Sequence, residues 1–188
     1  MEFVASGVIL VTVIAALNIA LTWAVSRRWR QRIRAFSVSQ HHGAPFEADL
    51  GIAVGDRMPV FTGTTATGET VTNQDLAGQE ALIAFLSLDC PSCDASVPAF
   101  TEVAEAVRTR GGRIMATVVG IDAVNSELLS HVSASADFVI PEFLDAPFGN
   151  LFDARVYPCF VHYGHDGVVT ASGYGLEGLG EIAQPATL

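Results

Sequence analysis

The sequence predicts an α/β domain with a mixed central sheet, preceded by one N-terminal transmembrane helix. Two observations predict the domain: residues 81–88 and 113–121 are almost continuously apolar, and segments with helical periodicity alternate with them. A third observation predicts the membrane helix, because residues 3–25 contain no charged side chain. The length of 188 residues fits about one domain with an appendage.

The uncharged segment Phe3–Val25 is long enough to cross a bilayer. Its 23 residues would form a helix of about 35 Å, and the hydrocarbon core is about 30 Å thick. Trp23 and Trp29 stand where aromatic residues flank a membrane interface. A cleaved signal peptide is the other interpretation, but no basic residue precedes the apolar run. We therefore expect residues 1–26 to be an uncleaved single-pass anchor in the cell membrane, with the lipid bilayer as its partner.

Residues 27–54 are expected to be a basic juxtamembrane segment and a linker, and residues 55–188 the folded domain. Five of the 10 arginines lie between positions 27 and 34, whereas almost all of the 20 acidic residues come later. The positive-inside rule applied to this cluster places the domain in the cytoplasm. The net charge of −10 and the absence of lysine exclude a nucleic-acid-binding protein, which needs a basic face.

The first half of the domain is expected to hold a hairpin, a buried strand and a long helix. Val60–Thr72 predicts two short strands around a Thr67-Gly68 turn, and Asn73–Leu76 a turn or short helix. Ala81–Leu88 is typical of a strand that is covered on both faces. Cys90–Arg110 carries one apolar face at helical spacing and ends before a pair of glycines.

The second half continues the alternation and ends in a hairpin. Arg113–Ile121 is a second apolar strand, and Asp166-Gly167 favours a tight turn between two later strands. The other expected elements are helices at Ser126–Val132, Phe148–Ala154 and Glu177–Ala183 and strands at Phe138–Ile140, Cys159–Tyr163 and Val168–Ser172. Strands that alternate with helices and end in a hairpin favour an α/β sandwich.

The segment Cys90-Pro91-Ser92-Cys93 carries the most specific chemistry. It lies where a buried strand meets a helix, the context in which a C-x-x-C segment indicates a dithiol redox motif. The free N–H groups and the dipole of a helix N-terminus favour the thiolate of Cys90. Cys93 lies one turn further on, where it can attack a mixed disulfide. We expect these two residues to be catalytic in thiol–disulfide exchange, with no cofactor and no bound metal.

This turn, together with Gly55-Asp56-Arg57-Met58-Pro59-Val60-Phe61 before it and Pro98 after it, resembles a known family. The segments are similar to those of membrane-anchored thioredoxin-like oxidoreductases of the TlpA/ResA type, most closely the MauD-like proteins of methylamine-dehydrogenase maturation. The resemblance covers about residues 50–175. It implies a thioredoxin-like fold and a membrane-tethered thiol–disulfide reductase or isomerase.

The resemblance also implies a substrate site and partners. Tyr157-Pro158 matches the family's cis-proline loop, which packs opposite the cysteines and, with Pro91 and Ser92, would shape the substrate groove. The implied partners are a protein thiol or disulfide as substrate and a membrane protein as electron donor. The family's placement is outside the cytoplasm, in conflict with the arginine cluster. We expect the extracytoplasmic placement, with the cytoplasmic one as the alternative.

Two positions depart from the family pattern. Thioredoxin has a buried aspartate six residues before its first cysteine, where this chain has Ala84, and ResA-like proteins have a glutamate six residues after it, where this chain has Ser96. The usual proton acceptor is therefore absent from both positions. Asp89 and Asp94 flank the motif and are the alternative acceptors, but we expect them to be solvated charges at the helix end, and as nearby negative charges they would raise the thiol pKa.

Cys159, which follows the expected cis-proline, has three interpretations. It is a small buried strand residue, an auxiliary redox thiol, or a metal ligand, and we expect the first. In the third case the protein would be a membrane-tethered Cu(I)-delivery module that uses Cys90, Cys93 and Cys159 or His162. A zinc site would need two more ligands at suitable spacing. A peroxiredoxin is not expected, because Ile83 stands where that family has proline.

Overall fold

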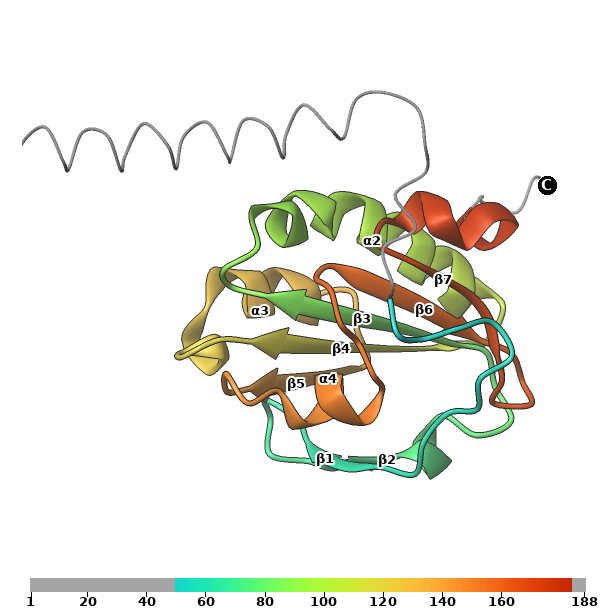
Figure 1. Cartoon of the computed structure of the whole chain (residues 1–188), viewed down its shortest axis with the longest axis horizontal. Helices are drawn as coiled ribbons and strands as arrows, with labels where there is room; N and C mark the ends of the chain where they lie inside the picture. Colours follow the sequence, from blue (N-terminus) through green and yellow to red (C-terminus); the bar gives the residue numbers. More distant parts are fainter. Residues whose placement is uncertain (1–49, 184–188) are drawn as a thin grey trace, which may run out of the picture. The chain divides into compact units, whose positions relative to one another are not determined.

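A five-stranded mixed sheet lies at the centre of the described residues, 50–183, in the computed structural model (Figure 1). Its strand order is β5-β4-β3-β6-β7. The strands are β3 (Ala81–Ser87), β4 (Arg113–Val119), β5 (Phe138–Glu142), β6 (Cys159–Tyr163) and β7 (Val169–Gly173). β3, β4 and β5 are parallel to one another, whereas β6 runs antiparallel to β3 and β7 antiparallel to β6. This arrangement confirms the predicted mixed sheet.

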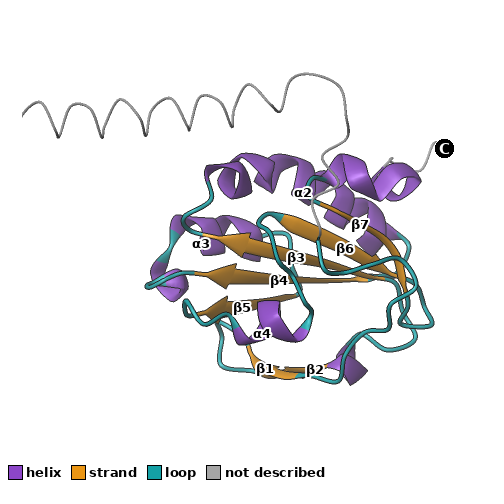
Figure 2. Cartoon of the chain, in the orientation of Figure 1, coloured by secondary structure: helices purple, strands orange, loops and turns teal. Residues whose placement is uncertain are grey.

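Different elements cover the two faces of the sheet (Figure 2). One face carries α2 (Pro91–Thr109), α3 (Glu127–Ser133) and the 3-10 helix η3 (Leu176–Ala183). The other face carries α4 (Pro147–Leu151) and a two-stranded antiparallel sheet of β1 (Thr62–Thr64) and β2 (Thr70–Thr72). Two further 3-10 helices are η1 (Asn73–Asp75) and η2 (Ala123–Asn125).

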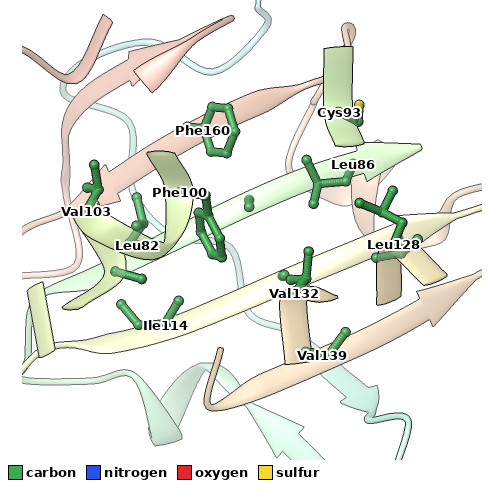
Figure 3. Packing of buried hydrophobic residues seen from close by; sticks show 14 of the residues in the cluster. Leu82, Leu86, Cys93, Phe100, Val103, Ile114, Leu128, Val132, Val139 and Phe160 are labelled. Atoms are coloured by element: carbon green, nitrogen blue, oxygen red, sulfur yellow. The ribbon is translucent and has the colours of Figure 1, made fainter. Parts of the chain in front are cut away.

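The two layers make two hydrophobic cores, one on each side of β3. The α2-side core includes Leu82, Ala84, Leu86, Cys93, Phe100 and Phe160 (Figure 3). The α4-side core includes Phe61, Ile83, Phe85, Phe148, Phe152 and Cys159. Because successive side chains of a strand point to opposite faces, a strand between two layers needs an apolar residue at every position. This explains the continuous apolar run of β3, whose residues from Ala81 to Leu86 are at most 1% exposed.

The predicted elements are present, with shifted boundaries. β5 runs through Pro141 to Glu142, two residues beyond the prediction. It is an edge strand, so a residue without an N–H is tolerated there. α4 begins earlier than predicted, because Pro147 takes the first helical turn, where its missing N–H needs no partner. The last predicted helix is a 3-10 helix with a kink at Gly180, where φ is 55°, and η2 was not predicted.

The described residues include a few that precede the expected domain start. Ile52 is 4% exposed, and its carbonyl oxygen accepts a hydrogen bond of 2.8 Å from Ser172 Oγ. Packing contacts therefore begin before Gly55. The anchor expected at residues 1–26 and most of the expected linker lie outside the described residues. Within residues 50–183, no helix is both long enough and apolar enough to cross a membrane.

Candidate redox site

Cys90 and Cys93 lie where β3 leads into α2. Cys90 is the N-cap residue of α2 with extended backbone, and Pro91 is the first helical residue. The backbone N–H of Cys93 donates to the carbonyl of Cys90 over 2.9 Å. The Cα atoms are 5.3 Å apart, and the two sulfurs are joined in a disulfide. The predicted dithiol segment therefore closes into one compact ring at a helix N-terminus.

The two cysteines differ in access to solvent. Cys90 is half-buried, whereas Cys93 is fully buried in the α2-side core near Leu86 (Figure 3). An external disulfide can therefore reach the sulfur of Cys90. Cys93 is accessible only to the sulfur of Cys90, to which it is bonded. This is the asymmetry that separates an attacking cysteine from a resolving one.

The loop between β3 and α2 is held by the end of β4. The backbone N–H of Leu88 donates to the carbonyl of Val119 over 2.9 Å, and the N–H of Asp89 donates to Ser87 Oγ over 3.3 Å. The side chain of Leu88 lies against Gly120, where a Cβ would overlap it. The glycine after β4 thus makes room for the loop that presents Cys90.

The Tyr157–Pro158 peptide bond is cis, as predicted. The antiparallel register pairs Phe85 of β3 with Cys159 of β6. Continued by two residues, this register places Pro158 and Tyr157 beside the C-terminal end of β3, the end that leads to Cys90. The two segments are 65 residues or more apart in the sequence, so only the sheet brings them together.

The ring of Tyr157 is oriented toward α4. A Cβ on Gly149 would lie only 2.7 Å from the Tyr157 hydroxyl oxygen, so the absence of a side chain there makes room for the phenol. Burial, with the Glu142 carboxylate second, raises the pKa of Tyr157. Its hydroxyl therefore stays protonated at neutral pH. The backbone of the cis-proline loop, rather than this phenol, is the part directed to the redox end of the sheet.

A groove of about 450 Å³ opens beside Cys90. It is lined by Ser87, Leu88, Asp89, Cys90, Pro91, Asp94, Ser126, Glu127 and Leu128. Three of these described lining residues are acidic and none is basic. Of the residues expected to shape a substrate groove, Pro91 is among the lining residues of this one; the substrate-binding role of Pro91, Ser92, Tyr157 and Pro158 stays a prediction.

Ser92 contacts both Cys90 and a residue that the sequence did not single out. Its hydroxyl oxygen lies 3.3 Å from Cys90 Sγ and 3.2 Å from the hydroxyl oxygen of Tyr174. Tyr174 lies between β7 and η3 and is 45% exposed. A single aromatic residue between Gly173 and Gly175 is the only local signal, and no spacing rule connects it to a motif 82 residues away.

The positions that lack the family's acidic residues have other roles here. Ala84 is buried in the α2-side core, and Ser96 Oγ donates to the carbonyl of Cys93 over 2.7 Å. A buried carboxylate that sequence reasoning missed is Glu142, 5% exposed at the end of β5. It accepts a hydrogen bond from the backbone N–H of Phe148 at the start of α4. Burial raises the pKa of Glu142.

The Cu(I) interpretation is wrong for this fold. Cys159 belongs to the α4-side core, whereas Cys93 belongs to the α2-side core on the other face of the sheet. His162 pairs with Leu82, near the opposite end of β3 from Cys90. Strand alternation and register therefore keep these side chains apart. Within residues 50–183, no group of three histidine, cysteine or acidic side chains is arranged to hold a metal ion.

Cys159 is a buried strand residue in this structure. It is 0% exposed, and burial raises the pKa of its thiol to about 12. The thiol is therefore protonated at neutral pH, and solvent does not reach it. These properties favour the packing role over that of an auxiliary redox thiol.

The fold and the paired cysteines define a thioredoxin-like thiol–disulfide oxidoreductase. Residues 53–175 match the model of the Redoxin family, and the chain belongs to this family. The chain is 29% identical over 146 residues to the methylamine utilization protein MauD of Methylobacillus flagellatus, with 75% of this chain and 68% of the relative covered.

Two solved structures show the same fold. One is the thioredoxin domain of a thiol-disulfide oxidoreductase from Bacteroides vulgatus, with a TM-score of 0.53 and 18% identity over 64% of this chain and 88% of that one. The other is a thiol:disulfide interchange protein of the thioredoxin family from Chlorobium tepidum, with a TM-score of 0.51 and 19% identity over 70% of this chain and 95% of that one.

Proposed function

We propose that this protein is a membrane-tethered thiol–disulfide oxidoreductase that reduces or isomerises disulfides of other proteins through Cys90 and Cys93. The observation that carries the proposal is the paired, unequally exposed cysteines at the N-terminus of α2. Family membership supports the reaction class. The uncharged segment Phe3–Val25 supports the tether, because its length and composition suit a bilayer span.

The reaction runs through two exchanges at sulfur. The Cys90 thiolate attacks one sulfur of the substrate disulfide, an S–S bond forms between them, and the other substrate sulfur leaves as a thiolate that takes up a proton. Cys93 then loses its proton and attacks Cys90 Sγ. The second substrate sulfur leaves as a thiolate and is protonated in turn. The substrate gains two electrons and two protons, and the protein is left with the Cys90–Cys93 disulfide.

Different parts of the described site support different steps of this reaction. The groove beside Cys90 gives a substrate segment room to approach, and the helix N-terminus favours the thiolate form of the attacking residue. The buried position of Cys93 keeps external disulfides from reacting with it directly. The backbone of Tyr157 and Pro158 stands at the same end of the sheet, where an extended substrate segment would pair with it.

The catalytic cycle needs a partner that restores the dithiol. Each substrate reduction leaves the oxidised form, so a donor must return two electrons, and a tethered domain would meet such a donor in the same membrane. We propose that the domain lies outside the cytoplasm, the placement that the family resemblance of the sequence implies. A membrane-impermeant thiol reagent applied to intact cells tests this placement. After the disulfide is reduced with a membrane-impermeant reductant, labelling of Cys90 in intact cells supports it, and labelling only after lysis supports the cytoplasmic alternative.

The first test of the proposal is the reduction potential of the Cys90–Cys93 pair in the full-length protein. The protein is equilibrated with glutathione or dithiothreitol buffers, and free thiols are counted after alkylation. A reversible two-electron couple between about −270 and −200 mV supports a reductase or isomerase. A value near −120 mV indicates an oxidant instead. Absence of a reversible couple overturns the proposal, and Cys159→Ser, the matched control, should keep the wild-type potential.

A further inference from the structure

Ser92 and Tyr174 form a chain of two hydroxyl groups that ends at the reactive sulfur. Ser92 Oγ lies 3.3 Å from Cys90 Sγ, and the Tyr174 hydroxyl lies 3.2 Å from Ser92 Oγ. The chain joins two distant parts of the fold, the first turn of α2 and the segment that connects β7 to η3. Both residues are exposed, so both remain accessible to a substrate at Cys90.

The covalent state of the site determines which group donates. Cys90 Sγ is bonded to Cys93 and carries no hydrogen, so Ser92 must be the donor in the contact with sulfur. Its oxygen is then free to accept the hydrogen of the Tyr174 hydroxyl. A phenol is a better donor than an aliphatic alcohol, and linked hydrogen bonds polarise one another. The hydrogen of Ser92 is therefore directed at the sulfur before the disulfide is reduced.

The hydroxyl groups of Ser92 and Tyr174 matter for the stability of a Cys90 thiolate, because the described charged side chains near this sulfur are negative. Asp89 and Asp94 flank the cysteine pair, and Glu127 of α3 lines the same groove. All three disfavour a thiolate. His131 Nδ1 lies 3.8 Å from Asp94 Oδ1, and both side chains are exposed. The helix N-terminus alone would thus have to oppose three carboxylates.

We propose that Ser92 donates a hydrogen bond to the Cys90 thiolate and that Tyr174 is a positioning residue that orients and polarises the Ser92 hydroxyl. The inference rests on the proposed thiol–disulfide exchange and adds to it two residues that set the fraction of reactive thiolate. When the disulfide is reduced, the hydrogen of Ser92 already points at the sulfur that becomes charged. Charge-assisted hydrogen bonds are about twice as strong as neutral ones, so this hydrogen bond stabilises the Cys90 thiolate more than the neutral thiol.

The test is the pH profile of Cys90 alkylation in the reduced full-length protein, with thiolate absorbance as a second readout. Ser92→Ala should lower the acid dissociation constant of Cys90 about tenfold, because a hydrogen bond to a charged group is lost. Tyr174→Phe keeps the ring and should lower that constant about threefold, since it acts through Ser92. Ser92→Thr keeps a hydroxyl and should restore the wild-type profile.

The matched control is Tyr163→Phe, which removes a buried phenol hydroxyl from the α4-side core. It should leave the profile of Cys90 unchanged. The inference is overturned if Tyr174→Phe leaves the acid constant of Cys90 unchanged or raises it while the protein still forms the disulfide reversibly. That outcome differs from a failure of the proposed function, in which the wild-type protein itself shows no reversible couple.

Discussion

The two ends of β3 are built from different chemistry. At the C-terminal end, Cys90 stands beside a groove whose described lining includes three carboxylates and no basic side chain. At the N-terminal end, Glu80 has basic side chains around it: Arg110 Nε is 3.0 Å away, His162 Nε2 3.6 Å and His165 Nε2 3.9 Å. The C-terminal end of β3 therefore has several carboxylates beside the two cysteines. At the N-terminal end, the carboxylate of Glu80 forms an ion pair with Arg110.

The charged residues at the two ends of β3 have different roles, one structural and one functional. Glu80 is held by its partners, and although burial raises its pKa, the Arg110 and His162 contacts lower it below the ordinary value of 4.5. These contacts connect the start of β3 to the end of α2 and to β6. Asp94 and Glu127 each lie in the first turn of a helix, where a negative charge is favourable, and because they also line the groove they attract or repel what approaches Cys90. Each of the following predictions perturbs one of the two ends of β3.

The largest effect is expected from Cys93→Ala. The variant can still attack a substrate disulfide through Cys90, but no second thiol completes the exchange. Turnover should fall to the uncatalysed level, and a mixed disulfide with the protein substrate should accumulate on non-reducing gels. Cys159→Ala removes the buried third thiol and should keep full turnover. Normal turnover by Cys93→Ala would show that the resolving thiol comes from elsewhere.

At the other end of β3, Glu80→Gln should lower the free energy of unfolding by about 1–2 kcal/mol, because Arg110 and the buried His162 lose their anionic partner. Urea unfolding measures the change. Glu105→Gln breaks the more exposed pair with Arg108 and should cost less than about 0.5 kcal/mol. Neither variant should change the rate of thiol exchange, and a slower exchange in Glu80→Gln would show that the two ends are coupled.

A smaller effect is expected from the groove charges. The double variant Asp94→Asn with Glu127→Gln should react about three- to tenfold faster with oxidised glutathione, which is anionic, and more slowly with cystamine, which is cationic. The ratio of the two rates is the readout, and salt should reduce the difference. Glu102→Gln changes an exposed carboxylate of α2 outside the groove lining and should leave the ratio unchanged. An unchanged ratio in the double variant would show that these charges do not select substrates.

The smallest effect is the pH dependence contributed by His162. Burial lowers its pKa below 6.5 despite the Glu80 carboxylate, with Arg110 and His165 also lowering it. Between that lowered value and 6.5, the unfolded chain binds a proton that the folded chain does not, so the free energy of unfolding rises with pH there. The slope is at most about 1.4 kcal/mol per pH unit. His162→Gln should remove this contribution, while Val161→Ala should lower stability without changing the slope. An unchanged slope in His162→Gln would contradict the assignment.

Much of the redox site could be predicted from the sequence because its signals are local. A buried strand followed by C-x-x-C and a helix specifies where two thiols stand, since strand, turn and helix are contiguous in the chain. The cis state of Tyr157–Pro158 was also predicted and is confirmed. That prediction came from the family resemblance, because a proline by itself does not specify its isomer.

Other parts of the site could not be predicted, because they join residues that are distant in the chain. Tyr174 reaches Ser92 across 82 positions, and no pattern of apolar residues encodes that contact. The same holds for Glu142, whose burial follows from α4 packing over the end of β5. The Cu(I) interpretation failed for a related reason. It treated Cys159 as close to Cys90 and Cys93, although the faces of a strand and its register decide proximity.

The sequence alone determined the class of fold, the location of the dithiol and the continuous apolar run that buries both faces of β3. These properties follow from short-range periodicity and from residue chemistry, which a linear chain already contains. Only the tertiary structure decided that Cys159 and Cys93 point into different cores, that a groove lined by Asp89, Asp94 and Glu127 opens beside Cys90, and that Tyr174 reaches Ser92. Those relations depend on strand order, register and layer packing, which only the folded chain establishes.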